Sequence, residues 1–271
     1  MKNEMKNFAA ACAFAAVTIT GAVLANYAHA KYTSPIWDMR RTLSMTFGQS
    51  RIALEAPMGM CFLDESQYME AALIKQMRQA GHDSGEGLLM AIFASCNEIE
   101  KFAQLPKLAA ETMPGVDPPT ADLDNRGMIT WLAPKLGRAP LGLGEYLDMR
   151  EAGYGDEIKQ TIAKGYKKFG ASQSIKMADN VTTKLLTAAP DQYKFDERAT
   201  RTASGVSISY NSAFVSEYTK HSQFGAVGTT MLRHFPVQVT MIGDGKRGPK
   251  SQADMHATMG RYLAQLSKLN P

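Results

Sequence analysis

The sequence predicts an α+β protein in which an antiparallel-rich sheet is covered by helices and a C-terminal amphipathic helix closes the fold. Strand and helix patterns are mixed in the first half of the chain, hairpin patterns dominate from residue 192 onward, and a helical pattern comes last. In that last segment five apolar residues recur at helical spacing and define one face: Met255, Met259, Tyr262, Leu263 and Leu266.

The folded region is expected to begin with two strands that alternate with two helices. Alternating apolar residues predict a strand that Pro57 ends. The next apolar residues recur at helical spacing, and Gly81 with the polar residues after it is expected to stop this helix. A continuous apolar run then predicts a strand buried on both faces, followed by a short helix. These elements are expected at 51–56, 66–80, 88–94 and 97–104.

The middle of the chain is predicted to be a loop followed by helices. Residues 105–126 carry four prolines and several acidic residues, which is typical of a long surface loop. A strand is expected at 128–132, and helical spacing recurs at 143–150 and 157–169, giving a helical middle region at about 142–170. The lysines of the last of these helices are not interleaved with aromatic residues, which favours a solvated face over a binding face.

Strand patterns then lead to the final helix. Alternation predicts strands at 206–210 and 237–241, and a further strand near 225–233 is expected to pair with the second of these through a turn. Residues 243–250 combine glycine, lysine and proline without the phosphate-loop pattern, so we expect a turn that leads into the helix.

The first 30 residues have the layout of a secretory signal peptide. Lys2 and Lys6 precede an apolar run at 8–24, and small residues around Ala30 suit a signal peptidase. The run is too short and too rich in alanine for a stable membrane anchor, and no later run is long enough to span. We therefore expect a periplasmic or secreted protein. The expected organisation is a signal peptide at 1–30, a lead-in segment at 31–50 and a single α+β domain at 51–271.

Three segments carry a resemblance to known proteins. They are Ala56-Pro57-Met58-Gly59-Met60-Cys61-Phe62-Leu63-Asp64, the apolar strand that leads to Cys96, and Phe235-Pro236-Val237-Gln238-Val239 before a helix that ends near Asn270 and Pro271. The chain resembles secreted proteobacterial proteins of unknown function, and its order of elements is similar to the PsbP-like α/β/α sandwich. This resemblance implies an envelope protein, and it assigns no catalytic residue.

Charge and motifs exclude several classes of function. The 30 basic and 26 acidic residues give a net charge of only +4 without a basic cluster, so we expect no nucleic-acid partner. The chain lacks G-x-S-x-G, H-E-x-x-H, paired C-x-x-C and EF-hand patterns. His82, Asp83 and Ser84 are adjacent, whereas the members of a catalytic triad converge from distant positions. No catalytic residue or cofactor is therefore predicted.

Methionines provide the lesser candidates for a metal site, and no metal site is predicted as the favoured interpretation. The chain has 17 methionines, and thioethers are soft ligands that suit Cu(I). Methionine also fills irregular cores, and this second explanation covers those that lie on helical apolar stripes. The candidate ligands for Cu(I) are Met58 and Met60 in one cluster and Met255, His256 and Met259 in another.

The cysteines support the sharpest prediction. Cys12 leaves with the signal peptide, so Cys61 and Cys96 remain as an even pair in an oxidising compartment. A parallel pairing of the strands 51–56 and 88–94 would bring both cysteines to one edge of the sheet. We expect a structural disulfide between them, and the alternative is a pair of buried free thiols.

The functional hypotheses come from different classes. Because no catalytic or metal motif is found, the favoured one is a non-catalytic periplasmic or secreted protein that binds a partner or supports an envelope assembly. The alternative is a periplasmic hydrolase whose site is assembled from scattered residues, since geometry rather than sequence order defines a site. A Cu(I)-binding protein is the lesser alternative.

Overall fold

The computed structural model describes residues 16–18, 40–47, 49–84, 87–111, 123–132, 142–169, 172–178, 181–186, 190–215, 220–244 and 249–271. The predicted cleavage site near Ala30, most of the predicted signal peptide and residues 31–39 lie outside these ranges, as do 112–122 of the predicted loop and 245–248 of the predicted turn.

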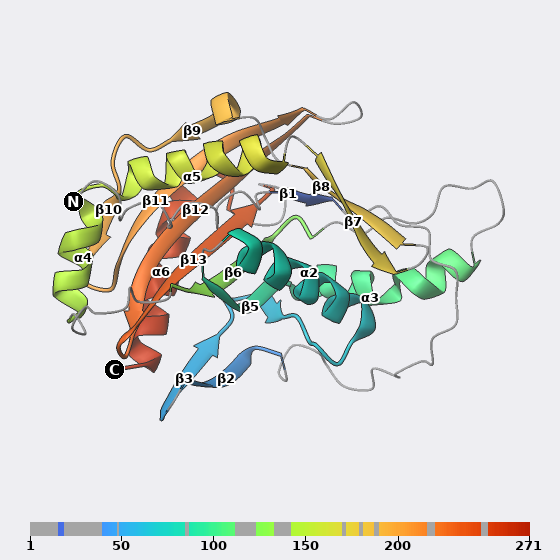
Figure 1. Ribbon diagram of the computed structural model, residues 1–271, viewed down its shortest axis with the longest axis horizontal. Coiled ribbons are helices and arrows are strands. Elements are labelled where there is room, and N and C mark those ends of the chain that lie inside the picture. Colours follow the sequence, from blue (N-terminus) through green and yellow to red (C-terminus); the bar gives the residue numbers. More distant parts are fainter. Residues whose placement is uncertain are drawn as a thin grey trace.

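A large antiparallel sheet forms the centre of the molecule (Figure 1), which confirms the predicted fold class. Its strands follow the order β10–β11–β12–β13–β6–β5–β4, and β9 pairs with β11 beside this path. The predicted hairpin is formed by β12 and β13. The strands are β4 (Met60–Phe62), β5 (Leu88–Ser95), β6 (Arg126–Trp131), β9 (Tyr193–Phe195), β10 (Thr200–Thr202), β11 (Gly205–Val215), β12 (Lys220–Leu232) and β13 (Phe235–Gly243).

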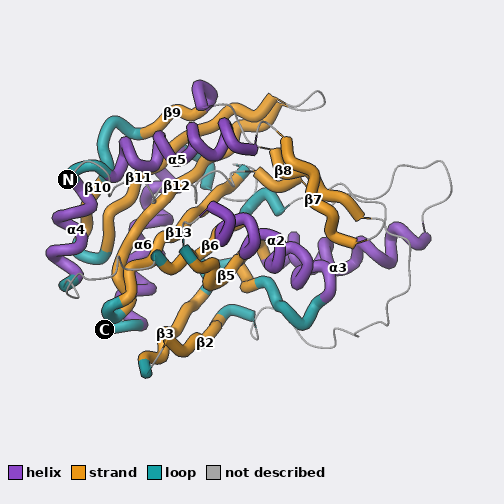
Figure 2. Tube along the Cα trace, in the orientation of Figure 1, coloured by secondary structure: helices purple, strands orange, loops and turns teal. Residues whose placement is uncertain are grey.

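Two smaller sheets accompany the large one, as the trace in Figure 2 shows. One is the hairpin of β2 (Thr42–Phe47) and β3 (Ser50–Glu55). The other joins β7 (Ser172–Ala178), β8 (Val181–Leu186) and β1 (Ala16–Thr18). Because β1 lies inside the segment that the sequence predicts is removed at export, the mature protein would keep β7 and β8 as a hairpin.

Helices cover both faces of the large sheet, so the layers follow the order helix, sheet, helix. In Figure 1, α6 (Gln252–Leu269) lies behind the sheet, and the β2–β3 hairpin shares its hydrophobic core. The opposite face carries α2 (Tyr68–Ser84), α3 (Cys96–Glu111), α4 (Leu143–Glu151) and α5 (Tyr154–Phe169). No helix among the described residues combines the length and the apolar character needed to cross a membrane.

The closing helix α6 packs on β11 and β12 where these strands carry glycine. The Oγ of Ser251 accepts a hydrogen bond from the backbone N–H of Asp254 and caps the helix, and all five predicted apolar residues are buried. A Cβ at Gly228 would lie 2.8 Å from Leu263 Cδ1, and one at Gly205 would lie 2.7 Å from the same atom. These glycines therefore let the helix approach the strands closely.

The structure adds strands to one segment and corrects two predicted element boundaries. The segment 31–50, for which no structure was predicted, contains β2 and the start of β3. Gly81 does not end the second element, because α2 continues to Ser84. The loop predicted over 105–126 is wrong in its first part, because α3 runs on to Glu111. A glycine inside a helix destabilises it by about 1 kcal/mol relative to alanine, and tertiary packing of the helix can offset this loss.

Strand β6 contains a glycine that the sheet requires. Gly127 pairs with Phe93 across the β5–β6 ladder, and the phenyl ring occupies the space where a side chain at Gly127 would lie. A Cβ there would be 2.3 Å from the Phe93 ring and 2.5 Å from the backbone oxygen of Thr240.

We expect Gly127→Ala to lower the free energy of unfolding by about 1–3 kcal/mol, because the added methyl overpacks a rigid ladder. Gly144→Ala in α4 is the matched control, because nothing lies within 4 Å of its Cβ position. It should leave stability unchanged or raise it by about 0.5–1 kcal/mol through helix propensity. Urea titrations of both variants test this, and equal stabilities would contradict the proposed clash.

Candidate functional site

The large sheet has an open edge at β5. Strand β4 spans three residues and pairs only with the C-terminal part of β5, from Phe93 to Ser95. One further hydrogen bond follows, from the backbone N–H of Leu63 to the oxygen of Ile92. Beyond it the chain leaves the sheet and enters α2, so no described strand covers the outer edge of β5 at 88–91. Such an edge presents backbone donors and acceptors to another strand.

A groove of about 420 Å³ lies along this edge, and we call it the edge groove. One wall comes from β2, through Thr42 and Leu43, and the opposite wall comes from α2, through Ile74 and Arg78. The outer edge of β5 forms its floor. The complete lining is Arg40, Thr42, Leu43, Phe62, Leu63, Asp64, Glu65, Ile74, Arg78, Leu89, Met90, Ala91 and Ile92.

A bulge in β5 shapes the floor. The register with β6 shifts between Leu89 and Ala91, so Met90 is an extra residue in the ladder. Met90 and Ala91 consequently both pack in the core under α6, whereas Leu89 and Ile92 pack in the core under α2. The edge groove therefore meets apolar side chains from both layers of the molecule.

A buried ion pair holds Arg40, which lines the edge groove. Arg40 Nη1 donates to both carboxylate oxygens of Glu70 at 2.9 Å, and its Nη2 donates to Asp64 Oδ2 at 3.4 Å. The backbone N–H of Asp64 also donates to Glu70 Oε2, at 2.7 Å. Glu70 is completely buried in the first turn of α2, and this burial raises the pKa of its carboxyl despite Arg40. The network ties the start of β2 to α2.

The mouth of the edge groove carries a second, exposed ion pair. Arg78 Nη2 donates to Glu65 Oε1, and the two side chains are 38% and 60% exposed. Each arginine in the lining thus has a carboxylate partner. The edge groove therefore offers an apolar floor between balanced charges and no excess of either sign.

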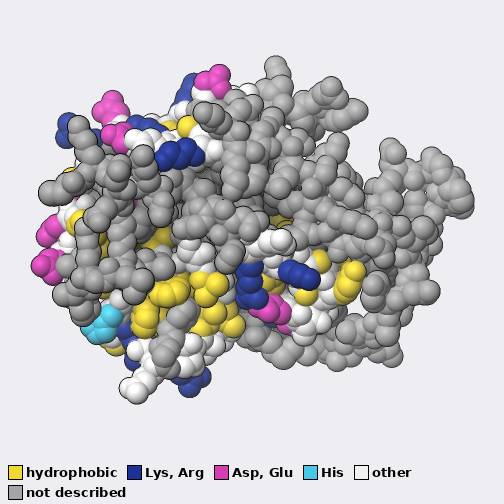
Figure 3. Space-filling model, viewed as in Figure 1, with side chains coloured by type: hydrophobic (Ala, Val, Ile, Leu, Met, Phe, Trp, Pro, Cys, Tyr) yellow, Lys and Arg dark blue, Asp and Glu magenta, His cyan; other side chains and the backbone are white. Residues whose placement is uncertain are grey.

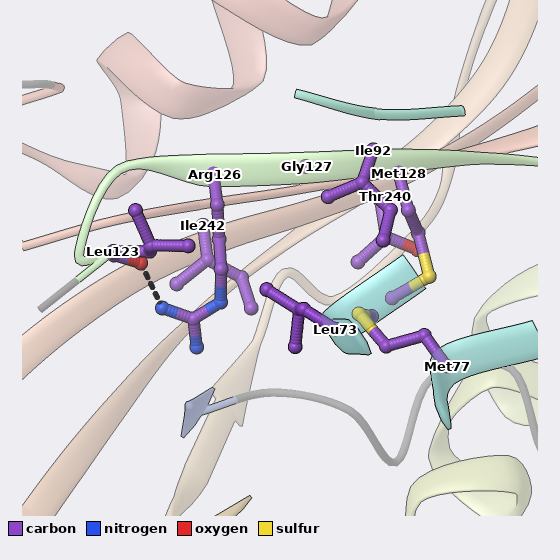
Figure 4. Close-up of a pocket in the computed structure, with 9 residues that line it drawn as sticks. All are labelled: Leu73, Met77, Ile92, Leu123, Arg126, Gly127, Met128, Thr240 and Ile242. Atoms are coloured by element: carbon purple, nitrogen blue, oxygen red, sulfur yellow. Dashed lines mark hydrogen bonds between the residues drawn. The ribbon is translucent and has the colours of Figure 1, made fainter. Parts of the chain in front are cut away.

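A second cavity lies under α2 but has no room for a ligand. Figure 4 shows Leu73 and Met77 of α2 facing Arg126 and Met128 of β6 across it. Its volume of about 20 Å³ holds about one water molecule. Arg126 donates to the backbone oxygen of Leu123 beside this cavity.

A serine, an aspartate and a histidine come together where β11, the residue after β9 and α6 meet. Ser209 Oγ donates to Asp196 Oδ2, and His256 Nδ1 lies 3.6 Å from the same oxygen. Gln252 Nε2 donates to Asp196 Oδ1 at 2.8 Å. Because the carboxylate of Asp196 stands between the serine and the histidine, the hydroxyl contacts the carboxylate and not the imidazole of a catalytic triad, and Ser209 is buried. The group ties α6 to β11 and has no nucleophile that a substrate could reach.

A buried carboxyl also lies outside the edge groove. Glu98 accepts hydrogen bonds from the backbone N–H and from Nδ2 of Asn125, at 3.1 and 2.9 Å. Burial raises the pKa of Glu98, and the nearby carboxylates of Asp124 and Asp244 act in the same direction. The contacts of Glu98 connect α3 to the start of β6, which is a structural role.

The structure places most of the methionines that the sequence offered as Cu(I) ligands in a hydrophobic core. Met58 is 92% exposed at the turn before β4, whereas Met60 packs against the core under α6. Met255 and Met259 are buried beneath α6, while the intervening His256 points to Asp196. Core packing accounts for three of these four methionines. Within the described ranges, no group of three or more His, Cys, Asp or Glu side chains is arranged to hold a metal ion.

A disulfide joins Cys61 in β4 to Cys96 at the start of α3, as the sequence predicts. The Cα atoms are 5.0 Å apart, and both cysteines are buried. The predicted parallel pairing of 51–56 with 88–94 is wrong. Within the described strands, β3 pairs with β2 alone, and the short antiparallel strand β4 brings Cys61 to β5 instead. A connection of four residues between β3 and β4 was too short to be recognised as a change of sheet.

Sequence reasoning did not find the edge groove. Arg40 lies in a segment for which no structure was predicted, and Asp64 was named only as the last residue of a segment that carries the family resemblance. Thr42 and Arg78 belong to no motif. The groove depends on where β4 ends, and three residues of strand leave no periodic signal.

The visible surface carries mixed charge. Figure 3 shows basic and acidic side chains interspersed, with apolar side chains gathered near the lower centre of the view, where β5 and β6 lie in Figure 1. Leu88, at the start of β5, is 50% exposed. Lys159 and Lys164 of α5 are exposed, and Lys159 lies 3.8 Å from Asp156, which agrees with a solvated helix face.

No family model matches the chain, and no curated protein is similar to it. The functional argument therefore depends on the geometry of the edge groove.

Proposed function

We propose that this chain is a non-catalytic protein of the bacterial envelope that binds a protein partner at the edge groove. One observation carries the proposal: a groove of about 420 Å³ runs along a sheet edge that no described strand covers, with apolar residues on its floor and ion pairs among its lining residues. The volume lies within the roughly 300–1,000 Å³ of concave ligand pockets, so the edge groove has room for several side chains of a partner segment.

The location in the envelope has independent support. The first 30 residues have the layout of a signal peptide, and the disulfide between Cys61 and Cys96 suits an oxidising compartment such as the periplasm. The compartment also narrows the partner to an exported or membrane protein that exposes a segment outside the cytoplasm.

The chemistry of the edge groove favours binding over catalysis. Arg40 and Arg78 are held by carboxylates, and the lining contains no cysteine, histidine or lysine among its described residues. A hydrolase would need a nucleophile or an activated water with a base in reach. The group around Asp196 does not provide one, because Ser209 is buried and contacts the carboxylate rather than the histidine.

Site-specific photo-crosslinking in living cells tests the proposal. Thr42 and Thr46 are both exposed threonines on β2, but only Thr42 lines the edge groove. A photoreactive amino acid at Thr42 should give one prominent adduct with an envelope protein, and the same amino acid at Thr46 should not.

The adduct must then be reproduced with purified components. The partner identified by mass spectrometry should bind the oxidised mature protein, and Thr42→Trp, which fills the edge groove, should weaken binding at least tenfold, whereas Thr46→Trp should not. Equal crosslinking from both positions, or equal affinity of the two variants, would contradict a partner site in the edge groove.

A further inference from the structure

We infer that the partner binds by strand addition: an extended, uncharged segment pairs with the outer edge of β5 at 88–91 and continues the line of β4. This inference rests on the proposed function and specifies the chemistry of its partner. The ligand class is an uncharged peptide segment in β conformation whose side chains are apolar on both faces of the added strand.

The backbone of β5 provides the first argument. β5 extends over eight residues, and β4 covers its outer side only from Phe93 to Ser95, with one more hydrogen bond at Ile92. The remaining stretch, 88–91, has no strand of the described chain on that side. At about 3.3 Å per residue it offers an edge about 13 Å long, which matches a short added strand.

The walls provide the second argument. Successive side chains of an added strand would point alternately to the two faces of the sheet. On one face they would meet Leu43 of β2 and Met90, and on the other Ile74 of α2 and Leu89. All four are apolar side chains, so apolar residues on the added strand would be buried on both sides.

The charges of the edge groove decide between ligand classes. Its lining contains two arginines and two carboxylates, and each arginine is engaged by a carboxylate. A polyanion such as a nucleic acid or an anionic lipid surface needs a basic excess, which this lining does not offer. An uncharged peptide segment needs no excess of basic side chains in the lining, so it fits the balanced charges of the edge groove.

Two N-methylated peptides test strand addition directly. The probe is a capped, fluorescently labelled hexapeptide of alternating threonine and valine, together with isomers methylated on the odd or on the even backbone nitrogens. A strand that pairs along one edge uses only alternate N–H groups. One isomer should therefore bind the oxidised mature protein like the parent peptide, and the other at least tenfold more weakly.

Matched surface variants locate the site. Leu88→Lys places a charge on the exposed start of the free edge, a device that blocks edge pairing, and should weaken peptide binding at least tenfold. Met58→Lys makes the same kind of change at a side chain that is 92% exposed in the turn before β4 and does not belong to the free edge of β5, and it should leave binding unchanged. Hydrogen exchange should show that the peptide protects amides within 88–91.

Each other outcome overturns the inference. No binding of the parent peptide at millimolar concentration, or equal binding of both isomers, excludes strand addition. A concentration-dependent dimer that Leu88→Lys abolishes would assign the edge to a second copy of the chain. Binding to phosphatidylglycerol vesicles that Leu88→Lys abolishes would assign it to a membrane. If crosslinking from Thr42 succeeds while the isomers bind equally, the proposed function stands and strand addition fails, whereas failed crosslinking removes the proposed function itself.

Discussion

Replacing both Cys61 and Cys96 by alanine is expected to lower the free energy of unfolding by about 4 kcal/mol. The bond closes a loop of 35 residues, and the chain-entropy relation assigns about this value to a crosslink of that length. The loop contains α2 and β5, which carry two sides of the edge groove. The loss of stability comes from the greater freedom of the unfolded chain, and the loop thereby released includes these two sides of the proposed binding site.

Urea titration of the oxidised protein and of the double alanine variant measures this difference. The native protein treated with a reductant is the control, and it should lose a similar amount without any change of sequence. A difference below about 1 kcal/mol would contradict a structural role for the bond. Alkylation of the unreduced protein followed by intact-mass measurement should label no cysteine of the mature chain.

Arg40→Ala is expected to cost about 3–5 kcal/mol, because it leaves the carboxylate of Glu70 buried without its cationic partner. Glu70 is completely buried, and the Arg40 side chain is only 10% exposed. The neighbouring Arg41 gives a matched control. Its ion pair with Glu55 is 39% and 31% exposed, so Arg41→Ala should cost less than about 1 kcal/mol.

A second variant separates the buried charge from the lost packing. Arg40→Met combined with Glu70→Leu removes both charges and keeps apolar volume, so it should recover most of the stability that Arg40→Ala loses. Urea titrations of all four proteins provide the comparison. If Arg40→Ala and Arg41→Ala cost the same, the buried ion pair does not hold β2 against α2.

Strong periodic patterns made much of the fold predictable. The apolar stripe of α6 was predicted to the residue, since all five side chains from Met255 to Leu266 are buried. The buried run of β5 and the β12–β13 hairpin were found for the same reason. The disulfide was predicted from the expected compartment and the even number of cysteines and did not depend on strand geometry alone, so the prediction was correct although the predicted strand pairing was wrong.

Features that depend on contacts between distant segments could not be predicted. The serines of β11 alternate with Val206, Ile208 and Tyr210, yet Ser207 and Ser209 are buried because α6 covers that face. The edge groove needs the end of β4, the bulge at Met90 and the hairpin beside them to be placed together. None of these leaves a pattern in the sequence, because each is defined by its neighbours in space.

Asn270 connects two segments that are 217 residues apart. Its Oδ1 accepts a hydrogen bond from the backbone N–H of Ala53, and its Nδ2 donates one to the backbone oxygen of Ala53, both at 2.8 Å. The side chain thus makes the two hydrogen bonds to β3 that a neighbouring strand would make. Its backbone oxygen also accepts from the N–H of Arg233 in the β12–β13 turn. Contacts of such long sequence separation slow folding, because the loop between them must close first. Strand β3 therefore lacks this neighbour until the second-last residue of the chain is in place, so the β2–β3 hairpin and the edge groove beside it depend on the docking of α6.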